Sequence, residues 1–191
     1  MKTKLIIPAL IFCSAGFAQT TWTVDKTHSD IGFTITHMMI SEVDGRFNEF
    51  DAKVISNSDD FTGSKVEFTA QVSSINTNNE RRDGHLKGDD FFGAEAYPEI
   101  RFKGEIKKEG ESYYLEGDFT MKGVTKRERF DVKYNGQVPG GRGRKAGFKV
   151  TGTIDRFEYG LTWNRTIESG GLVVSREVGI TCNVQLNEEV R

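Results

Sequence analysis

The nine residues Val178–Leu186, VGITCNVQL, decide the fold class, because apolar side chains alternate in them with glycine or polar ones at every position. Successive side chains of a β-strand point to opposite faces, so a period of two is typical of a strand that buries one face. Cys182 stands in the middle of the apolar face. The segment therefore predicts a half-buried β-strand near the C-terminus.

The same alternation returns along most of the chain, which indicates a protein built largely from strands. The other segments that show it are 31–37, 66–72, 100–106, 113–119, 130–134 and 148–154. Short polar or glycine-rich connections at 108–111, 121–124 and 138–143 suit hairpins. Such short links make neighbouring strands antiparallel.

Long helices are not expected, since no long stretch spaces its apolar residues by 3.6. Short helices or turns are predicted at 79–87, 156–161 and 166–169. Roughly eight strands with one apolar face each can form two packed sheets or one closed sheet. Closure removes exposed edges, and eight strands enclose an interior that side chains or one elongated small ligand can fill. The sequence thus predicts an all-β fold and favours a barrel, with two packed sheets as the alternative.

The first eighteen residues have the features of a cleaved secretory signal. Lys2 and Lys4 precede an apolar run, Leu5–Phe12, and Gly16-Phe17-Ala18 supplies small residues before the predicted cut after Ala18. The run is well below the roughly 18 residues needed to span a bilayer, and no later segment is comparably apolar. We therefore expect residues 1–18 to be removed, residues 19–191 to form one domain, and no membrane span.

Charge and cysteine content exclude two classes of protein. The chain has 26 basic and 28 acidic residues, and loss of Lys2 and Lys4 leaves 24 basic residues and a net charge of −4. A nucleic-acid surface needs a basic excess on one face, so we expect no nucleic-acid partner. Only Cys182 remains after the cut, which rules out an intramolecular disulfide scaffold.

One segment, Asn78–Pro98, interrupts the strands with clustered polar and aromatic residues, NNERRDGHLKGDDFFGAEAYP. Such a segment across the end of a sheet or barrel suits the lid or mouth of an internal cavity. Arg81 and Arg82 would offer planar sets of donors to phosphate oxygens at the start of a short helix. The alternative is that Arg82 and Asp83 pair with each other or with neighbouring strands and hold the segment in place.

His37 continues the apolar face formed by Ile31, Phe33 and Ile35, so it is expected to point inward. A buried histidine costs free energy unless it is hydrogen-bonded. Three roles fit this position: a neutral core histidine bonded to the backbone, a contact to a ligand head group, or a metal ligand. The metal role lacks support, because the histidines and nearby Asp30 show no recognised ligand spacing.

The sequence contains no recognised catalytic motif. Neither Gly-x-Ser-x-Gly nor HExxH occurs, and a cysteine on an apolar strand face is typically inert packing. An arrangement of Ser29 and His28 with Asp30 or Asp83 would rest only on common residue types. We therefore expect a protein that is not an enzyme and uses no cofactor, with a hydrolase as the catalytic alternative.

Several short motifs occur in a fixed order along the chain. In the first half they are Thr27-His28-Ser29, Gly32-Phe33, His37, Gly45-Arg46-Phe47, Ile75-Asn76-Thr77, Arg82–Lys87, Asp90-Phe91-Phe92, Tyr97-Pro98 and Ile100-Arg101-Phe102. In the second half they are Phe119–Lys126, Ala146-Gly147-Phe148, Gly152–Arg156 and Phe157–Trp163. In this order the chain resembles the YceI family of periplasmic polyisoprenoid-binding proteins. It departs from the family at the glycine-basic tip Gly140–Arg144, where related chains often carry a tryptophan.

The resemblance implies an extended, lipocalin-like, eight-stranded antiparallel barrel with one or two short helices, exported to the periplasm. Its lumen would hold a long isoprenoid, such as a polyprenyl phosphate or an isoprenoid quinone, without catalysis. The alternative is that the many phenylalanines fill the core and the barrel binds proteins instead. An isologous homodimer is compatible with base rates. The residues we expect at the ligand are Phe33, His37, Phe68, Arg81, His85, Phe91, Phe92, Phe102, Phe119, Phe148 and Trp163.

Overall fold

Antiparallel strands make up most of the computed structural model, which describes residues 19–165 and 173–190. The strands are β1 (Thr20–Val24), β2 (Asp30–His37), β3 (Ser41–Phe47), β4 (Phe50–Ser56), β5 (Lys65–Gln71), β6 (Ile75–Asn76), β7 (Glu99–Glu109), β8 (Ser112–Met121), β9 (Val124–Pro139), β10 (Arg144–Asp155) and β11 (Val174–Glu188). The helical elements are α1 (Glu80–Lys87) and two 3₁₀ turns, η1 (Val72–Ser74) and η2 (Arg156–Tyr159). The predicted signal and the predicted turn at 166–169 lie outside the described residues.

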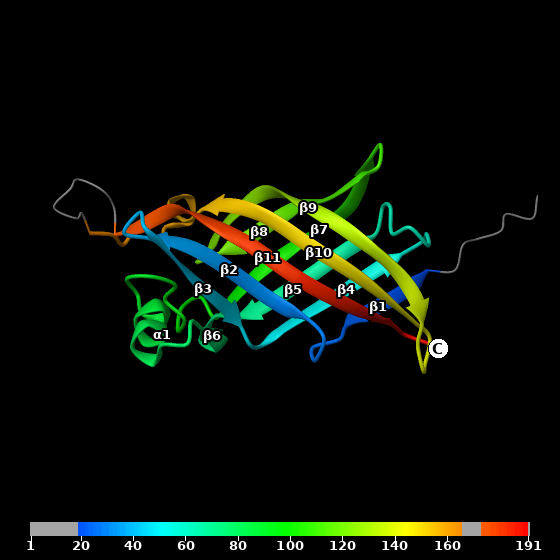
Figure 1. Cartoon of the computed structure of the whole chain (residues 1–191), viewed down its shortest axis with the longest axis horizontal. Helices are drawn as coiled ribbons and strands as arrows, with labels where there is room; N and C mark the ends of the chain where they lie inside the picture. Colours follow the sequence, from blue (N-terminus) through cyan, green and yellow to red (C-terminus); the bar gives the residue numbers. More distant parts are fainter. Residues whose placement is uncertain (1–18, 166–172, 191) are drawn as a thin grey trace, which may run out of the picture.

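The sheet closes on itself, as the sequence predicted. The order around the ring is β1, β4, β5, β7, β8, β9, β10 and β11, and β11 pairs with β1 to complete it (Figure 1). Strand β11 pairs with β1 through residues 186–188 and with β2 through residues 174–183. Thus β1 and β2 are two pieces of one interrupted strand, and β3 with β4 repeats this arrangement on the next strand. The eight-stranded antiparallel barrel is confirmed.

Period-two alternation located the long strands correctly. The predicted strand segments coincide with β2, β5 and β7 to β11, and the predicted hairpin turns lie between β7, β8, β9 and β10. The helix predicted at 79–87 is α1, capped by the Asn79 side chain, which accepts from the Arg82 backbone N–H at 3.1 Å. Val72 differs from the prediction, because it begins η1 rather than ending a strand.

One end of the barrel, next to the C-terminus, is closed by aromatic side chains. Phe61, in the loop between β4 and β5, is fully buried. Its ring centroid lies 5.0 Å from that of Trp22, 5.5 Å from Tyr134 and 4.9 Å from Phe148. These rings exclude water from that end, and aromatic pairs in such tilted arrangements stabilise the core beyond simple burial.

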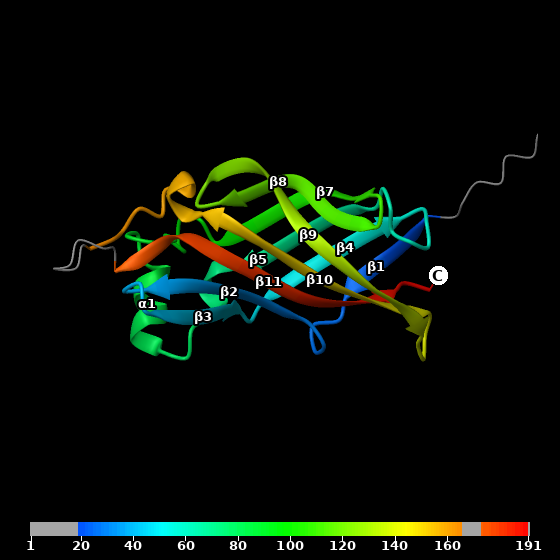
Figure 2. The same ribbon diagram turned by 45° about the horizontal axis from the view of Figure 1, so that its top comes forward.

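The opposite end carries α1 and the loop that follows it (Figure 2). Strand β6 pairs with β3, whereas the chain that leads from it to β7 forms α1 and residues 88–98. This segment therefore covers the end of the barrel at which β2 ends and β3 begins. That end of the barrel is called the helix end below.

The Phe33 ring lies flat across β3 because residue 45 is glycine. A Cβ at Gly45 would meet the tip of the Phe33 ring at 2.2 Å, far closer than real Cβ contacts. The ring also lies 5.8 Å from Phe47, centroid to centroid. Gly45 thus lets an aromatic side chain form part of the inner wall without filling the space at the centre of the barrel.

Candidate ligand-binding cavity

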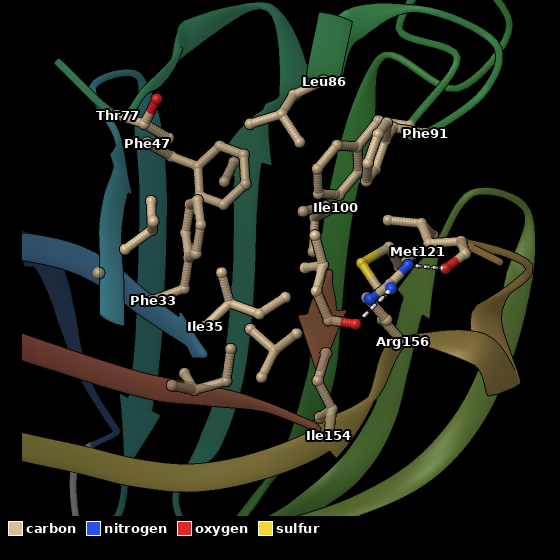
Figure 3. Close-up of a pocket in the computed structure, with 18 of the residues that line it drawn as sticks. Phe33, Ile35, Phe47, Thr77, Leu86, Phe91, Ile100, Met121, Ile154 and Arg156 are labelled. Atoms are coloured by element: carbon tan, nitrogen blue, oxygen red, sulfur yellow. Dashed lines mark hydrogen bonds between the residues drawn. The ribbon is translucent and has the colours of Figure 1, made fainter. Parts of the chain in front are cut away.

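The helix-end half of the barrel encloses an apolar cavity of about 290 Å³. Its wall comes from β2, β3, β5, β7, β8, β10 and β11, together with α1 and the segments after α1 and η2 (Figure 3). A second cavity, of about 120 Å³, is lined by apolar side chains of the same strands and their neighbours. Five residues line both cavities, namely Ile31, Phe68, Phe119, Ile180 and Cys182. The two spaces therefore adjoin inside the barrel.

Ten of the eleven residues predicted at the ligand line one or both cavities. Those that line only the larger cavity are Phe33, His37, His85, Phe91, Phe92 and Trp163. Phe68 and Phe119 line both, whereas Phe102 and Phe148 line the smaller one. Arg81 is the exception, because it is exposed and lines neither.

Three aromatic rings from separate segments meet in the cavity wall at the helix end. His85 belongs to α1, Phe91 to the loop after it, and Trp163 to the segment after η2. The ring of His85 is 5.0 Å from Phe91 and 5.1 Å from Trp163, and the last two are 5.0 Å apart. His85 Nε2 also lies 3.7 Å from an Asp90 carboxylate oxygen. All three rings line the cavity, and the side chain of His85 is also exposed to solvent.

Arg82 and Asp83 both bind Thr77, which ties α1 to the end of β6. The Arg82 Nε donates to Thr77 Oγ1 at 2.7 Å and an Nη donates to the Thr77 carbonyl at 2.8 Å. One Asp83 oxygen accepts from the Thr77 backbone N–H at 2.9 Å and from its hydroxyl at 2.5 Å. This geometry agrees with the structural interpretation of the pair. Arg82 also lines the larger cavity, and its Nη1 makes no hydrogen bond within the described part of the chain.

Arg156 is a cavity residue that the sequence analysis did not select. It is 2% exposed, and its guanidinium donates to four backbone carbonyls, those of Leu161, Trp163 (2.9 Å), Val174 (3.3 Å) and Ser175 (2.8 Å). In residues 19–165 and 173–190 no carboxylate lies within 4 Å of it. Burial lowers the pKa of Arg156, but arginine stays protonated in proteins. The wall thus holds a buried positive charge whose acceptors are neutral.

A signal for Arg156 was present in the chain. It follows Phe148, Val150 and Ile154 at the same two-residue spacing, so it continues the inward face of β10 into η2. The alternation indicated only which way it points. Its acceptors lie 5 to 19 residues later in the chain, after η2 and at the start of β11, and a two-residue period does not predict that these two segments converge on one side chain.

His37 lies at the end of β2, opposite Ser41 and Val174, and lines the larger cavity. Among the described residues its ring makes no hydrogen bond, so the backbone-bonded core histidine of the sequence analysis is not observed. Cys182 faces the lumen between the cavities. Desolvation raises the pKa of its thiol to about 12, which keeps it protonated and unreactive at neutral pH.

The residues considered for hydrolysis make no hydrogen bonds to one another in the described part of the chain. Ser29 Oγ accepts from the Gln185 backbone N–H at 2.9 Å, and His28 Nδ1 lies 3.1 Å from Asp25. Asp83 is committed to Thr77 near the helix end. Across the described ranges, no three His, Cys, Asp or Glu side chains form a group suited to a metal ion, and no helix is long and apolar enough to cross a membrane.

Comparisons with known proteins agree with this geometry. A family model described as a YceI-like domain matches residues 22–186. A UPF0312 protein of Staphylococcus aureus (strain USA300) is 39% identical over 170 residues, which cover 88% of this chain and 98% of the relative. The crystal structure of a Campylobacter jejuni YceI protein is 32% identical, with a TM-score of 0.70 over 87% of this chain and 96% of that one.

A more distant structure shares the fold. It is described as a polyisoprenoid binding domain from Saccharophagus degradans implicated in plant cell wall breakdown. It is 15% identical, with a TM-score of 0.65 over 88% of this chain and 98% of that chain. At this identity the likeness supports the barrel architecture alone.

Proposed function

This chain belongs to the YceI-like family, and we propose that its barrel binds a long isoprenoid lipid in the lumen without performing catalysis. The single observation that carries the proposal is the apolar cavity of about 290 Å³ beneath α1, which adjoins a second one deeper in the barrel. The ligand class is a polyprenyl phosphate or an isoprenoid quinone. The protein would carry, store or sense this lipid in the periplasm, where its N-terminal segment would direct it.

The energetics favour a long apolar chain. Removing apolar surface from water contributes about 25 cal/mol per Å². The deeper cavity is lined by aliphatic and aromatic side chains and Cys182. An apolar chain that enters it would therefore gain this free energy of burial without desolvating charged side chains. The end beside Phe61 is blocked by packed rings. We therefore expect the chain to enter from the helix end, tail first.

The polar head would then lie at the helix end, where the wall changes character. Arg82, His85 and Arg156 line the larger cavity there, together with the Thr77 hydroxyl. Guanidinium groups suit phosphate oxygens and also quinone carbonyls. The deeper cavity has no such groups in its lining. This distribution supports a ligand with one polar end.

Native mass spectrometry of the purified protein, followed by organic extraction, tests the proposal. A stoichiometric isoprenoid that leaves on extraction would support it and would identify the head group. A protein that is empty and also fails to take up added polyprenyl phosphate and quinone would refute it. The barrel would then be interpreted as an interaction protein whose core is filled by its own side chains.

The head-group position has its own test. Arg82→Gln should weaken a polyprenyl phosphate more than the matching polyprenol, because only the phosphate loses a charged partner. Comparing two ligands in one variant cancels any general loosening of α1. Arg81→Gln is the matched control, since Arg81 is exposed and outside both cavities. Equal weakening of both ligands would remove Arg82 from the head-group site.

A further inference from the structure

The tip of the β2–β3 hairpin is the most apolar exposed turn of the described chain. It consists of Met38, Met39 and Ile40, which are 41%, 70% and 85% exposed. The other short hairpin turns, between β7, β8, β9 and β10 at residues 110–111, 122–123 and 140–143, contain only glycine and charged residues. Solvation therefore does not explain the composition of this turn, because the same protein places polar or small residues at every comparable tip.

The backbone of the tip makes methionine an unusual choice. Met38 and Met39 have φ angles of +52° and +66°. Glycine, asparagine and aspartate are the residues that usually occupy such positions. Two long apolar side chains thus stand where small or polar ones would relieve strain.

The tip stands at the rim of the larger cavity. His37 lines that cavity and immediately precedes Met38, and Val43 lines it from the other strand of the hairpin. The Met38 N–H donates to the Val173 carbonyl at 2.8 Å, which ties the tip to the start of β11. The hairpin projects at the same end as α1 (Figure 2). A surface that contacts the tip therefore lies next to the proposed entrance of the cavity.

We propose that Met38, Met39 and Ile40 insert into the surface of a zwitterionic phospholipid bilayer and seat the cavity mouth on it. The proposal rests on the proposed lipid ligand, because a bilayer is where such a lipid resides. Three partly exposed side chains present a few hundred Å² at most, whereas a stable protein interface buries about 800 Å² on each partner. The patch is thus too small for a stable protein partner but suits a shallow apolar anchor.

The charges around the tip select the kind of bilayer. Residues 38–41 carry no charge, and Glu42 and Asp44 follow on β3. The basic residues at the same end are matched by acidic ones: Arg81, Arg82, Lys87, Lys122 and Arg165 stand against Glu80, Asp83, Asp89, Asp90 and Glu95. Because this end has no excess of basic residues, net attraction to anionic lipids would be weak, so insertion would depend on apolar contact and respond weakly to salt.

Flotation of the purified protein with phosphatidylcholine vesicles that contain no isoprenoid tests this proposal. We expect the wild-type protein to float with the vesicles, and Met39→Ser/Ile40→Ser to reduce the partition coefficient at least tenfold. Val138→Ser is the matched control, because Val138 is 60% exposed on β9 far from the helix end, and it should float as the wild type does. Wild-type protein that stays unbound, or a double variant that floats equally, would overturn the proposal.

A second measurement locates the contact. An environment-sensitive fluorophore on Ile40→Cys should brighten and shift to the blue on vesicles, whereas one on Val138→Cys should not. Labelling is selective because the Cys182 thiol stays protonated. Equal responses at the two sites would overturn the proposal. So would light scattering that shows a wild-type dimer and a monomeric double variant, since the tip would then be a self-contact.

Uptake from detergent separates this proposal from the proposed function. Detergent delivers the lipid without a bilayer, so Met39→Ser/Ile40→Ser should load polyprenyl phosphate as fully as the wild type, measured by native mass spectrometry. If neither protein loads but only the wild type floats, the tip binds bilayers and the lumen is not the lipid site. If both load and neither floats, the lumen proposal stands and the tip proposal fails.

Discussion

Replacing Cys182 by phenylalanine should block the lumen at its midpoint. Cys182 lines both cavities and lies on the inner face of β11 between Ile180 and Val184. A phenyl ring at this position would project into the space where the two cavities adjoin. Most of the larger cavity under α1 would stay open. The variant therefore tests whether a ligand reaches the deeper cavity, and not whether it can enter the barrel.

The loss of affinity can be estimated from the carbon atoms that the ring displaces. Burial contributes about 0.8 kcal/mol per CH₂, so exclusion of one five-carbon isoprene unit costs about 4 kcal/mol. At 1.4 kcal/mol per factor of ten, the dissociation constant should rise about a thousandfold. The unliganded variant should keep its free energy of unfolding within about 1 kcal/mol of wild type, because the ring enters free volume.

Titration calorimetry with a polyprenyl phosphate in a fixed amount of detergent measures the affinity, and urea denaturation measures the stability. Cys182→Ser is the matched control, since it keeps the small side chain and should bind within a few-fold of wild type. An unchanged affinity in a folded Cys182→Phe variant would refute the reasoning, because the chain would then lie elsewhere. A large loss of stability would show that the lumen has no free space at this depth.

Arg156→Met should lower the free energy of unfolding by roughly 3 kcal/mol in urea denaturation, because four carbonyls lose a buried charged donor; a change below about 0.5 kcal/mol would contradict this. Asp25 accepts from Thr27 and Lys145, and these donors hold its pKa well below the ordinary 3.8. Its stabilising effect is therefore present at neutral pH and is lost as the pH falls below about 4. Asp25→Asn should cost about 1–3 kcal/mol at pH 7, with a deficit that narrows in acid, and a deficit independent of pH would argue against the ionised contacts. The Cys182 thiol, with its pKa raised to about 12, should react with a disulfide reagent at pH 8 about a thousandfold more slowly than in the urea-unfolded chain; equal rates would show that the lumen is open to water.

The barrel was predictable because its long strands alternate cleanly, whereas the short strands carry a weaker pattern. In β3 the inner face includes Gly45, and the apolar surface over it is supplied by Phe33 from β2. The period of two within β3 therefore does not reveal this apolar surface, because the Phe33 ring covers Gly45 only once β2 has paired with β3. The closing role of Phe61 was also hidden, because it lies in a loop and contacts rings from three strands.

The aromatic part of the cavity was predictable for the same reason, and its cationic part was not. Phe68 and Phe119 lie on apolar faces, so their inward direction follows from the strand period. Arg81 and Arg82 are neighbours on a helix, where consecutive residues point in different directions. Only Arg82 turns toward Thr77 and the cavity, and composition alone cannot choose between them.

Photo-cross-linking tests the central claim most directly, namely that an isoprenoid chain lies inside the barrel. The probe is a polyprenyl phosphate with a diazirine at the end of its tail, and the labelled peptides are identified by mass spectrometry. We predict labelling of inner-face residues around Phe68, Phe119 and Cys182, and its loss from these positions in Cys182→Phe. Labelling confined to outward-facing residues, or unchanged in the blocked variant, would contradict the account.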